Sequence, residues 1–144
     1  MRKDLTSLEA TEQFANEVAK VLRPGESVGL SGELGAGKTT FVRFLSKALE
    51  SSTPVSSPTF VLAHEYQAAG GIKIEHWDLY RLGAVPEELE QAPDNQTIRL
   101  VEWADKIESY FGTLRLWIRF SQKSADARSV ELSPDLKSRL PGLE

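Results

Sequence analysis

The chain has 144 residues with 40% hydrophobic content, so we expect a single domain over residues 1–144, with a polar tail from about residue 134. The absence of cysteine excludes disulfides, thiol nucleophiles and thiolate metal sites. The formal net charge of -4 and the scattered basic residues argue against a dedicated nucleic-acid surface, and no apolar run or signal-peptide core points to a membrane, which favours the cytoplasm.

The first predicted element is a helix that begins near Thr6-Ser7-Leu8-Glu9, a plausible capping box, and stops at Pro24-Gly25. Its apolar face is traced by Leu8, Thr11, Phe14 or Ala15, Val18, and Val21 or Leu22. The next segment, Ser27 to Leu30, reads as a short buried strand.

Directly after this strand, residues Gly32 to Thr39 match the phosphate-binding pattern G-x-x-x-x-G-K-[ST] at every specified position. In such a loop, backbone N–H groups surround the phosphates of a nucleotide, Lys38 reaches the terminal phosphates, and the Thr39 hydroxyl contributes to a Mg²⁺ shell. A helix follows, with apolar residues at Phe41, Phe44, Leu45, Ala48 and Leu49. The alternative, a glycine-rich turn between a core strand and an amphipathic helix, is disfavoured because the motif and its flanks agree.

The remaining elements predict an α/β fold with a mixed sheet. Residues 50–58 read as a serine- and proline-rich loop, and residues 59–66 and 72–77 as an antiparallel hairpin around Ala68-Ala69-Gly70-Gly71. A short helical turn at 86–90 precedes strands at 98–101, 114–120 and 129–132. The expected fold is therefore a P-loop NTPase-like sheet flanked by helices, with an antiparallel hairpin.

Two carboxylates stand at strand ends, where they are expected to converge on the nucleotide. Asp78 closes one predicted strand and Glu102 closes another, and at least one must serve the metal. Thr59, which follows the serine-proline loop, is either a switch threonine that senses the γ-phosphate or, more simply, a strand-entry residue. His64 and His76 are interpreted as packed or hydrogen-bonded residues, and Arg81 as either a charge stabiliser or a surface contact.

The guanine-reading pattern N-K-x-D is absent, which favours ATP as the nucleotide. A small kinase that phosphorylates a metabolite, with Asp78 as the acceptor base, is the alternative to an ATP-hydrolysing switch, and a structural subunit that only binds ATP is a third possibility.

In its motifs the chain resembles the bacterial TsaE (YjeE) family of ATPases for tRNA threonylcarbamoyladenosine biosynthesis. The matching segments, in the family's order, are Gly32 to Thr40, Ser57 to Phe60, His76 to Leu82, Glu87 to Glu90, and Val101 to Trp103. The chain departs from the family after Glu90, where residues 91–96 are short and polar instead of a longer acidic-hydrophobic segment.

The resemblance implies a small cytoplasmic ATPase that hydrolyses ATP slowly with Mg²⁺ and acts with a TsaB–TsaD complex, so that tRNA is reached only indirectly. It implies that the phosphates are held by Gly35, Ala36, Gly37, Lys38, Thr39 and Thr40. Thr39 and Glu102 would hold the Mg²⁺, Thr59 would be the switch threonine, and Asp78 the acid needed for hydrolysis. Thr11 and Arg128 correspond to positions near the adenine.

Overall fold

The computed structural model describes residues 2–32, 37–51, 63–79, 86–103, 114–122 and 128–140. In chain order, the strands are β1 (Arg2–Leu5), β2 (Ser27–Gly32), β3 (Ala63–Gln67), β4 (Lys73–Asp78), β5 (Thr97–Trp103), β6 (Leu116–Gln122) and β7 (Arg128–Leu132). The helices are α1 (Leu8–Val21), α2 (Lys38–Ala48) and α4 (Pro134–Ser138), with 3-10 turns η1 (Ala69–Gly71) and η2 (Glu87–Glu90). Among these described helices, none is long and apolar enough to cross a membrane.

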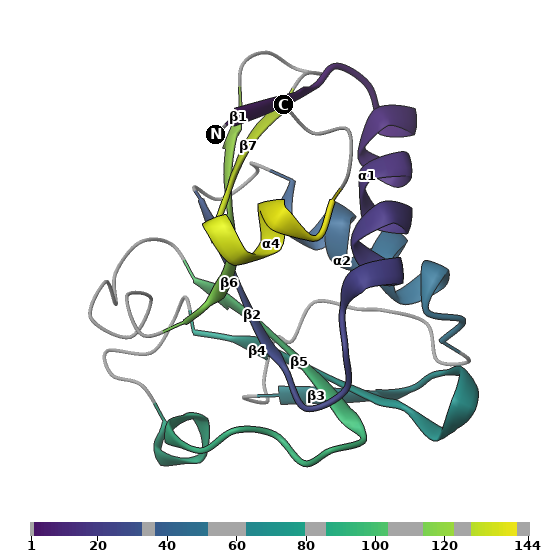
Figure 1. Ribbon diagram of the computed structural model, residues 1–144, viewed down its shortest axis with the longest axis vertical. Helices are drawn as coiled ribbons and strands as arrows, with labels where there is room; N and C mark the ends of the chain where they lie inside the picture. Colours follow the sequence, from purple (N-terminus) through teal and green to yellow (C-terminus); the bar gives the residue numbers. More distant parts are fainter. Residues whose placement is uncertain are drawn as a thin grey trace.

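All the described strands form one sheet in the order β1-β7-β6-β2-β5-β4-β3 (Figure 1). The inner pairs β6–β2, β2–β5 and β5–β4 are parallel. The hairpin β3–β4 and the pairs β6–β7 and β1–β7 are antiparallel. The predicted mixed α/β sheet with an antiparallel hairpin is therefore confirmed, and the carboxyl ends of its parallel strands meet at one edge.

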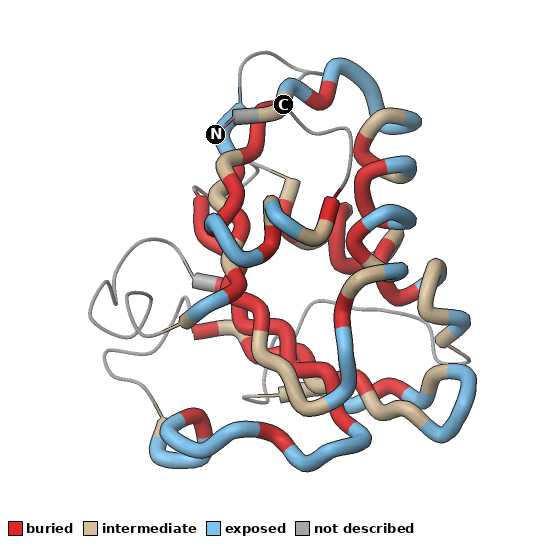
Figure 2. Tube along the Cα trace, viewed as in Figure 1, coloured by how far each residue is buried: buried red, intermediate tan, exposed pale blue. Residues whose placement is uncertain are grey.

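Aromatic side chains join α1 and α2 to the sheet in the main core. The ring of Phe41 in α2 lies 5.6 Å from that of Phe14 in α1 and 5.4 Å from that of Phe120 in β6, measured between centroids. Figure 2 shows buried residues on the side of α1 that faces the sheet and exposed residues on its outer side. Because that inward face runs along Thr11, Phe14, Ala15 and Val18, the predicted apolar residue Leu8 lies outside it and is 66% exposed.

Two terminal elements differ from the sequence prediction. The strand β1 was not predicted; its pairing partner is β7, at the other end of the chain. Within the segment expected as a polar tail from residue 134, the structure has α4, and Leu136 on this helix and Leu140 after it are buried in the core. The start of α4 has a typical N-terminal sequence, Ser133 followed by Pro134. The Ser133 hydroxyl caps the helix by accepting a hydrogen bond from the Leu136 N–H, and Pro134 occupies the first turn.

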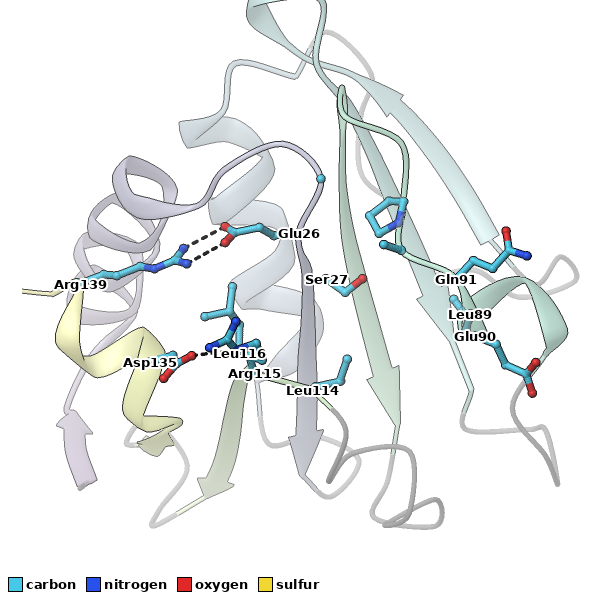
Figure 3. Close-up of a pocket in the computed structure, with 13 residues that line it drawn as sticks. Glu26, Ser27, Leu89, Glu90, Gln91, Leu114, Arg115, Leu116, Asp135 and Arg139 are labelled. Atoms are coloured by element: carbon cyan, nitrogen blue, oxygen red, sulfur yellow. Dashed lines mark hydrogen bonds and ion pairs between the residues drawn. The ribbon is translucent and has the colours of Figure 1, made fainter.

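An arginine–carboxylate pair holds the residue that follows α4 against the start of β2 (Figure 3). The Arg139 guanidinium donates to both Glu26 oxygens, at 2.8 and 2.7 Å, and to the Val21 carbonyl at the end of α1. Burial opposes ionisation of Glu26, but the hydrogen bonds from Arg139 and the Arg23 N–H, with both positive charges, outweigh it and lower the pKa of Glu26. The same pair raises the pKa of Arg139. The end of α1, the start of β2 and the C-terminal segment are thus linked through one carboxylate.

Replacement of Glu26 by Gln should lower the free energy of unfolding by about 1 kcal/mol at neutral pH, because it removes the charged acceptor of Arg139. Since the folded pKa of Glu26 is lowered, this contribution is complete above the ordinary value of 4.5 and is lost as the pH falls through the folded pKa. Urea unfolding of both proteins across this range measures the difference.

The matched control is Glu12→Gln, because Glu12 meets Lys47 at 3.8 Å with both side chains exposed. Its effect should stay within about 0.5 kcal/mol at every pH. A Glu26 difference that persists unchanged at low pH would show that its charge contributes no stability.

Candidate functional site

The site is built around the connection from β2 to α2, where two glycines have backbone angles that other residues rarely adopt. Gly32 ends β2 with φ 138°, and a Cβ there would lie 2.5 Å from the Phe120 carbonyl oxygen on β6. Gly37 precedes α2 in the left-handed region with φ 103°. Side chains are excluded at both positions, so the backbone can take the sharp path from strand to helix. Gly35 and Ala36 lie outside the described residues.

The first residue of α2, Lys38, is buried and points back along the connection. Its ammonium group donates to the carbonyl oxygen of Gly32. Thr39 and Thr40 follow in the first helical turn and are half-buried. Their backbone N–H groups belong to the set that has no acceptor within a helix.

The amino end of α2 differs from those of α1 and α4. Ser7 and Ser133 cap the other two helices, whose first turns carry Glu9 and Asp135. Among the described residues, no side chain caps α2 at Gly37, and its first turn has no acidic residue. The partial positive charge of this helix end is therefore left for an anionic ligand, such as a phosphate.

Arg128, the first residue of β7, lies over the same turn. Its Nε would be 3.2 Å from a Cβ built on Gly37, and its aliphatic carbons are almost as close. The structure thus brings this predicted adenine-side residue next to the amino end of α2. Any side chain at Gly37 would have to displace the arginine.

The two predicted carboxylates lie side by side at the end of neighbouring parallel strands. Asp78 on β4 pairs in register with Glu102 on β5, and Glu102 pairs with Leu30 on β2. The chain after β4 stays beside β5, since the Leu79 N–H donates to the Glu102 carbonyl at 2.8 Å. Asp78 is half-buried, and Glu102 is only 6% exposed. Both acids therefore stand at the sheet edge from which the β2–α2 connection leaves.

Glu102 has a buried partner, His76, two residues before Asp78 on β4. The His76 Nε2 and the Glu102 Oε2 share a hydrogen bond, and His76 is completely buried. The interpretation of His76 as a hydrogen-bonded residue is confirmed, but sequence analysis did not connect it with Glu102. The available signal was the spacing of His76 and Asp78, which places both on one face of a strand.

The roles predicted for Thr11, Thr59 and Arg81 are not tested by the described structure. Thr11 lies on the buried face of α1, where its hydroxyl donates to the Ser7 carbonyl at 3.3 Å, so its hydrogen bond stays within the helix. Thr59 and Arg81 fall outside the described residues. The proposed roles of these three residues remain predictions.

The available donors fit a hard cation. Hydroxyl and carboxylate oxygens from Thr39, Asp78 and Glu102 are the ligand types that Mg²⁺ prefers, and this ion is commonly held by one or two carboxylates plus the phosphates of its substrate. Within the described residues, no three His, Asp or Glu side chains gather into a metal-binding group. A cation here would therefore need oxygens from a ligand or from water.

A separate hollow of about 540 Å³ lies at the opposite edge of the sheet (Figure 3). It is lined by Ser27 and Leu116, the first residues of β2 and β6, and by residues 89–93. Its charged pairs, Arg139–Glu26 and Arg115–Asp135, are matched within the protein. The hollow is thus remote from the β2–α2 connection and is not the predicted phosphate site.

Comparison with known protein families gives a match over most of the chain. The family model described as "Threonylcarbamoyl adenosine biosynthesis protein TsaE" matches residues 5–130. The chain belongs to the TsaE family.

Relatives support this membership across distant bacteria. The chain is 44% identical to the tRNA threonylcarbamoyladenosine biosynthesis protein TsaE of Aquifex aeolicus, over 71% of this chain and 75% of the relative. It is 36% identical to the protein of the same name from Bacillus subtilis, over 85% of this chain and 78% of the relative. The crystal structure of Bacillus subtilis YdiB has a TM-score of 0.69 at 28% identity, over 97% of this chain and 93% of that chain. The sequence similarity to TsaE proteins thus covers most of the chain, and the fold is similar to that of YdiB.

Proposed function

We propose that this TsaE-family chain is a cytoplasmic, single-domain ATPase that binds ATP with Mg²⁺ and hydrolyses it slowly as an accessory protein of tRNA threonylcarbamoyladenosine modification. The observation that carries the proposal is the meeting of an uncapped helix start and two adjacent carboxylates at one sheet edge. The helix start can bind the phosphates of a nucleotide, and the carboxylates can bind the metal ion that accompanies them. Membership of the TsaE family supports a role in tRNA threonylcarbamoyladenosine biosynthesis.

In this proposal, the connection from Gly35 to Thr40 holds the phosphates. Lys38 leaves the Gly32 carbonyl to contact the terminal phosphates, and the first N–H groups of α2 bind the phosphate oxygens. Arg128 and Thr11 contact the nucleotide near its adenine. Arg128 has the stronger support, because it already lies over Gly37.

The metal would be held by Thr39 and Glu102, and it would screen the negative charge of the phosphates. Asp78 is the acid that supports hydrolysis. As a half-buried carboxylate beside Glu102, it can accept a hydrogen bond from an attacking water and orient that water. Thr59 is proposed to sense the γ-phosphate.

Replacement of Lys38 by Ala should lower ATP turnover about a hundredfold or more, because it removes the cation that contacts the terminal phosphates. The matched control is Lys47→Ala on the same helix, where the lysine side chain is 79% exposed. Both variants should unfold at similar temperatures, and Lys47→Ala should keep normal turnover. Turnover by Lys38→Ala at the normal rate would refute the proposed phosphate site.

The same assay, run with and without a TsaB–TsaD complex, tests the proposed partners. Phosphate release should be slow for the isolated chain and should change when the complex is added. Transfer of phosphate to a small metabolite, with no response to the complex, would favour the kinase alternative.

Substitution of Asp78 and substitution of Glu102 should have different effects, the first on turnover and the second on Mg²⁺ dependence. Asp78→Asn should keep nucleotide affinity and lose about a hundredfold in turnover, because it removes the group that orients water. Glu102→Gln should raise the Mg²⁺ concentration needed for half-maximal nucleotide binding by about tenfold or more, because it removes a metal ligand.

Glu65→Gln is the control for both variants, since Glu65 is an exposed carboxylate on β3 that faces Lys73. It should change neither quantity. Magnesium-titrated binding and turnover measured on all three proteins separate the roles, and the reverse pattern would exchange the functions of Asp78 and Glu102.

The isolated chain should bind tRNA weakly and without preference. Tight RNA binding needs clustered Lys and Arg residues that neutralise several phosphates, whereas this chain has 17 basic against 21 acidic residues and no basic run. A fluorescence titration at physiological salt measures this directly. Tight, tRNA-selective binding by the chain alone would contradict the proposal that it reaches RNA through its protein partners.

A further inference from the structure

We infer that His76 is a positioning residue, whose hydrogen bond to Glu102 fixes that carboxylate in the orientation that binds the cation. The inference rests on the proposed function, in which Glu102 contacts Mg²⁺. It adds to that function a residue that touches neither metal nor nucleotide.

The register of β4 and β5 places the two side chains together. His76 pairs with Leu100, and Glu102 lies two residues further along β5, so the histidine and the glutamate are diagonal neighbours on one face of the sheet. A carboxylate only accepts hydrogen bonds, so Nε2 of His76 must be the donor to Oε2. This bond engages one carboxylate oxygen and leaves Oε1 out of it.

The burial of His76 argues against a purely structural role. The ring is 0% exposed, and its Nδ1 is buried without a hydrogen-bond partner in the described part of the chain. A core histidine that serves only packing would be expected to satisfy both nitrogens or to be replaced by an apolar residue, because an unpaired buried acceptor is unfavourable. Of the two ring nitrogens of His76, Nε2 is the one with a hydrogen bond among the described residues, and its partner is Glu102.

Neighbouring groups hold the imidazole in this orientation. The Tyr66 ring, also buried, lies 6.4 Å from the His76 ring between centroids, and His64 pairs with His76 across the hairpin. The β3–β4 hairpin therefore positions the His76 Nε2 donor before any ligand binds. A metal ligand that is already oriented loses less freedom on binding, and loss of the groups that orient metal ligands typically weakens metal affinity about 10- to 100-fold.

Two amide substitutions distinguish positioning from packing. In His76→Gln, the amide nitrogen stands three bonds from Cβ, as Nε2 does, so it can still donate to Glu102. In His76→Asn, the amide nitrogen stands two bonds from Cβ, as Nδ1 does, and falls short. His76→Leu fills the space without a donor, and His64→Gln is the matched control on the neighbouring strand.

The measurement is the affinity for ADP by calorimetry, across a Mg²⁺ titration and again in EDTA, with the unfolding temperature of each variant. We expect His76→Asn and His76→Leu to need at least tenfold more Mg²⁺ for half of its effect on ADP affinity, with unchanged affinity in EDTA. His76→Gln should stay within about threefold of the unmodified chain, and His64→Gln should match it.

Three other results would overturn the inference that His76 positions Glu102. Normal Mg²⁺ dependence in a folded His76→Asn or His76→Leu variant would overturn the inference and leave the proposed function intact. Equal loss in the Gln variant, or a loss that also appears in EDTA, would assign His76 to packing and overturn it as well. If the unmodified chain shows no Mg²⁺ dependence, or if Glu102→Gln leaves that dependence unchanged, the proposed function and this inference both fail.

Discussion

The candidate site depends on the parallel pairing of β2 with β5 and of β5 with β4. Parallel strands end at the same edge, so one register brings Leu30, Glu102 and Asp78 into a row beside the point where the chain leaves β2. The close approach of Gly32 to the Phe120 carbonyl fixes the other side of that exit, because a side chain at Gly32 would push β6 away. Backbone pairing between these strands thus places Asp78 and Glu102 beside the end of β2.

Glu26 and Glu102, one half-buried and one buried, have contrasting electrostatic surroundings. Glu26, at the far edge, receives both guanidinium donors of Arg139, which satisfies its charge within the protein. Glu102 shares a hydrogen bond with the imidazole of His76. The first arrangement stabilises the fold by closing a charge pair, whereas the second keeps a carboxylate oriented and available to a cation.

Local signals in the sequence predicted much of the fold, and pairing between distant segments explains what they did not. The glycines and Lys38 of the β2–α2 connection, the Ser7 cap and the hairpin around residues 68–71 depend on neighbours in sequence, and they were readable. The strand β1 is short and charged, and its identity depends on β7. The C-terminal segment gives a weak helical signal, because Leu136 and Leu140 are the only hydrophobic residues among residues 134–140. Both leucines are nevertheless buried.

The pairing of β1 with β7 has a consequence for synthesis of the chain. The strand β1 is synthesised before all the other described strands and its partner β7 after them, so β1 remains unpaired until β7 emerges. The carbonyl at the end of α1 likewise waits for Arg139. Contacts between such distant segments slow folding, because the intervening chain must first be brought together. A ribosome that stalls before β7 would therefore hold a nascent chain in which β2, β4 and β5 are already made and β1 has no partner.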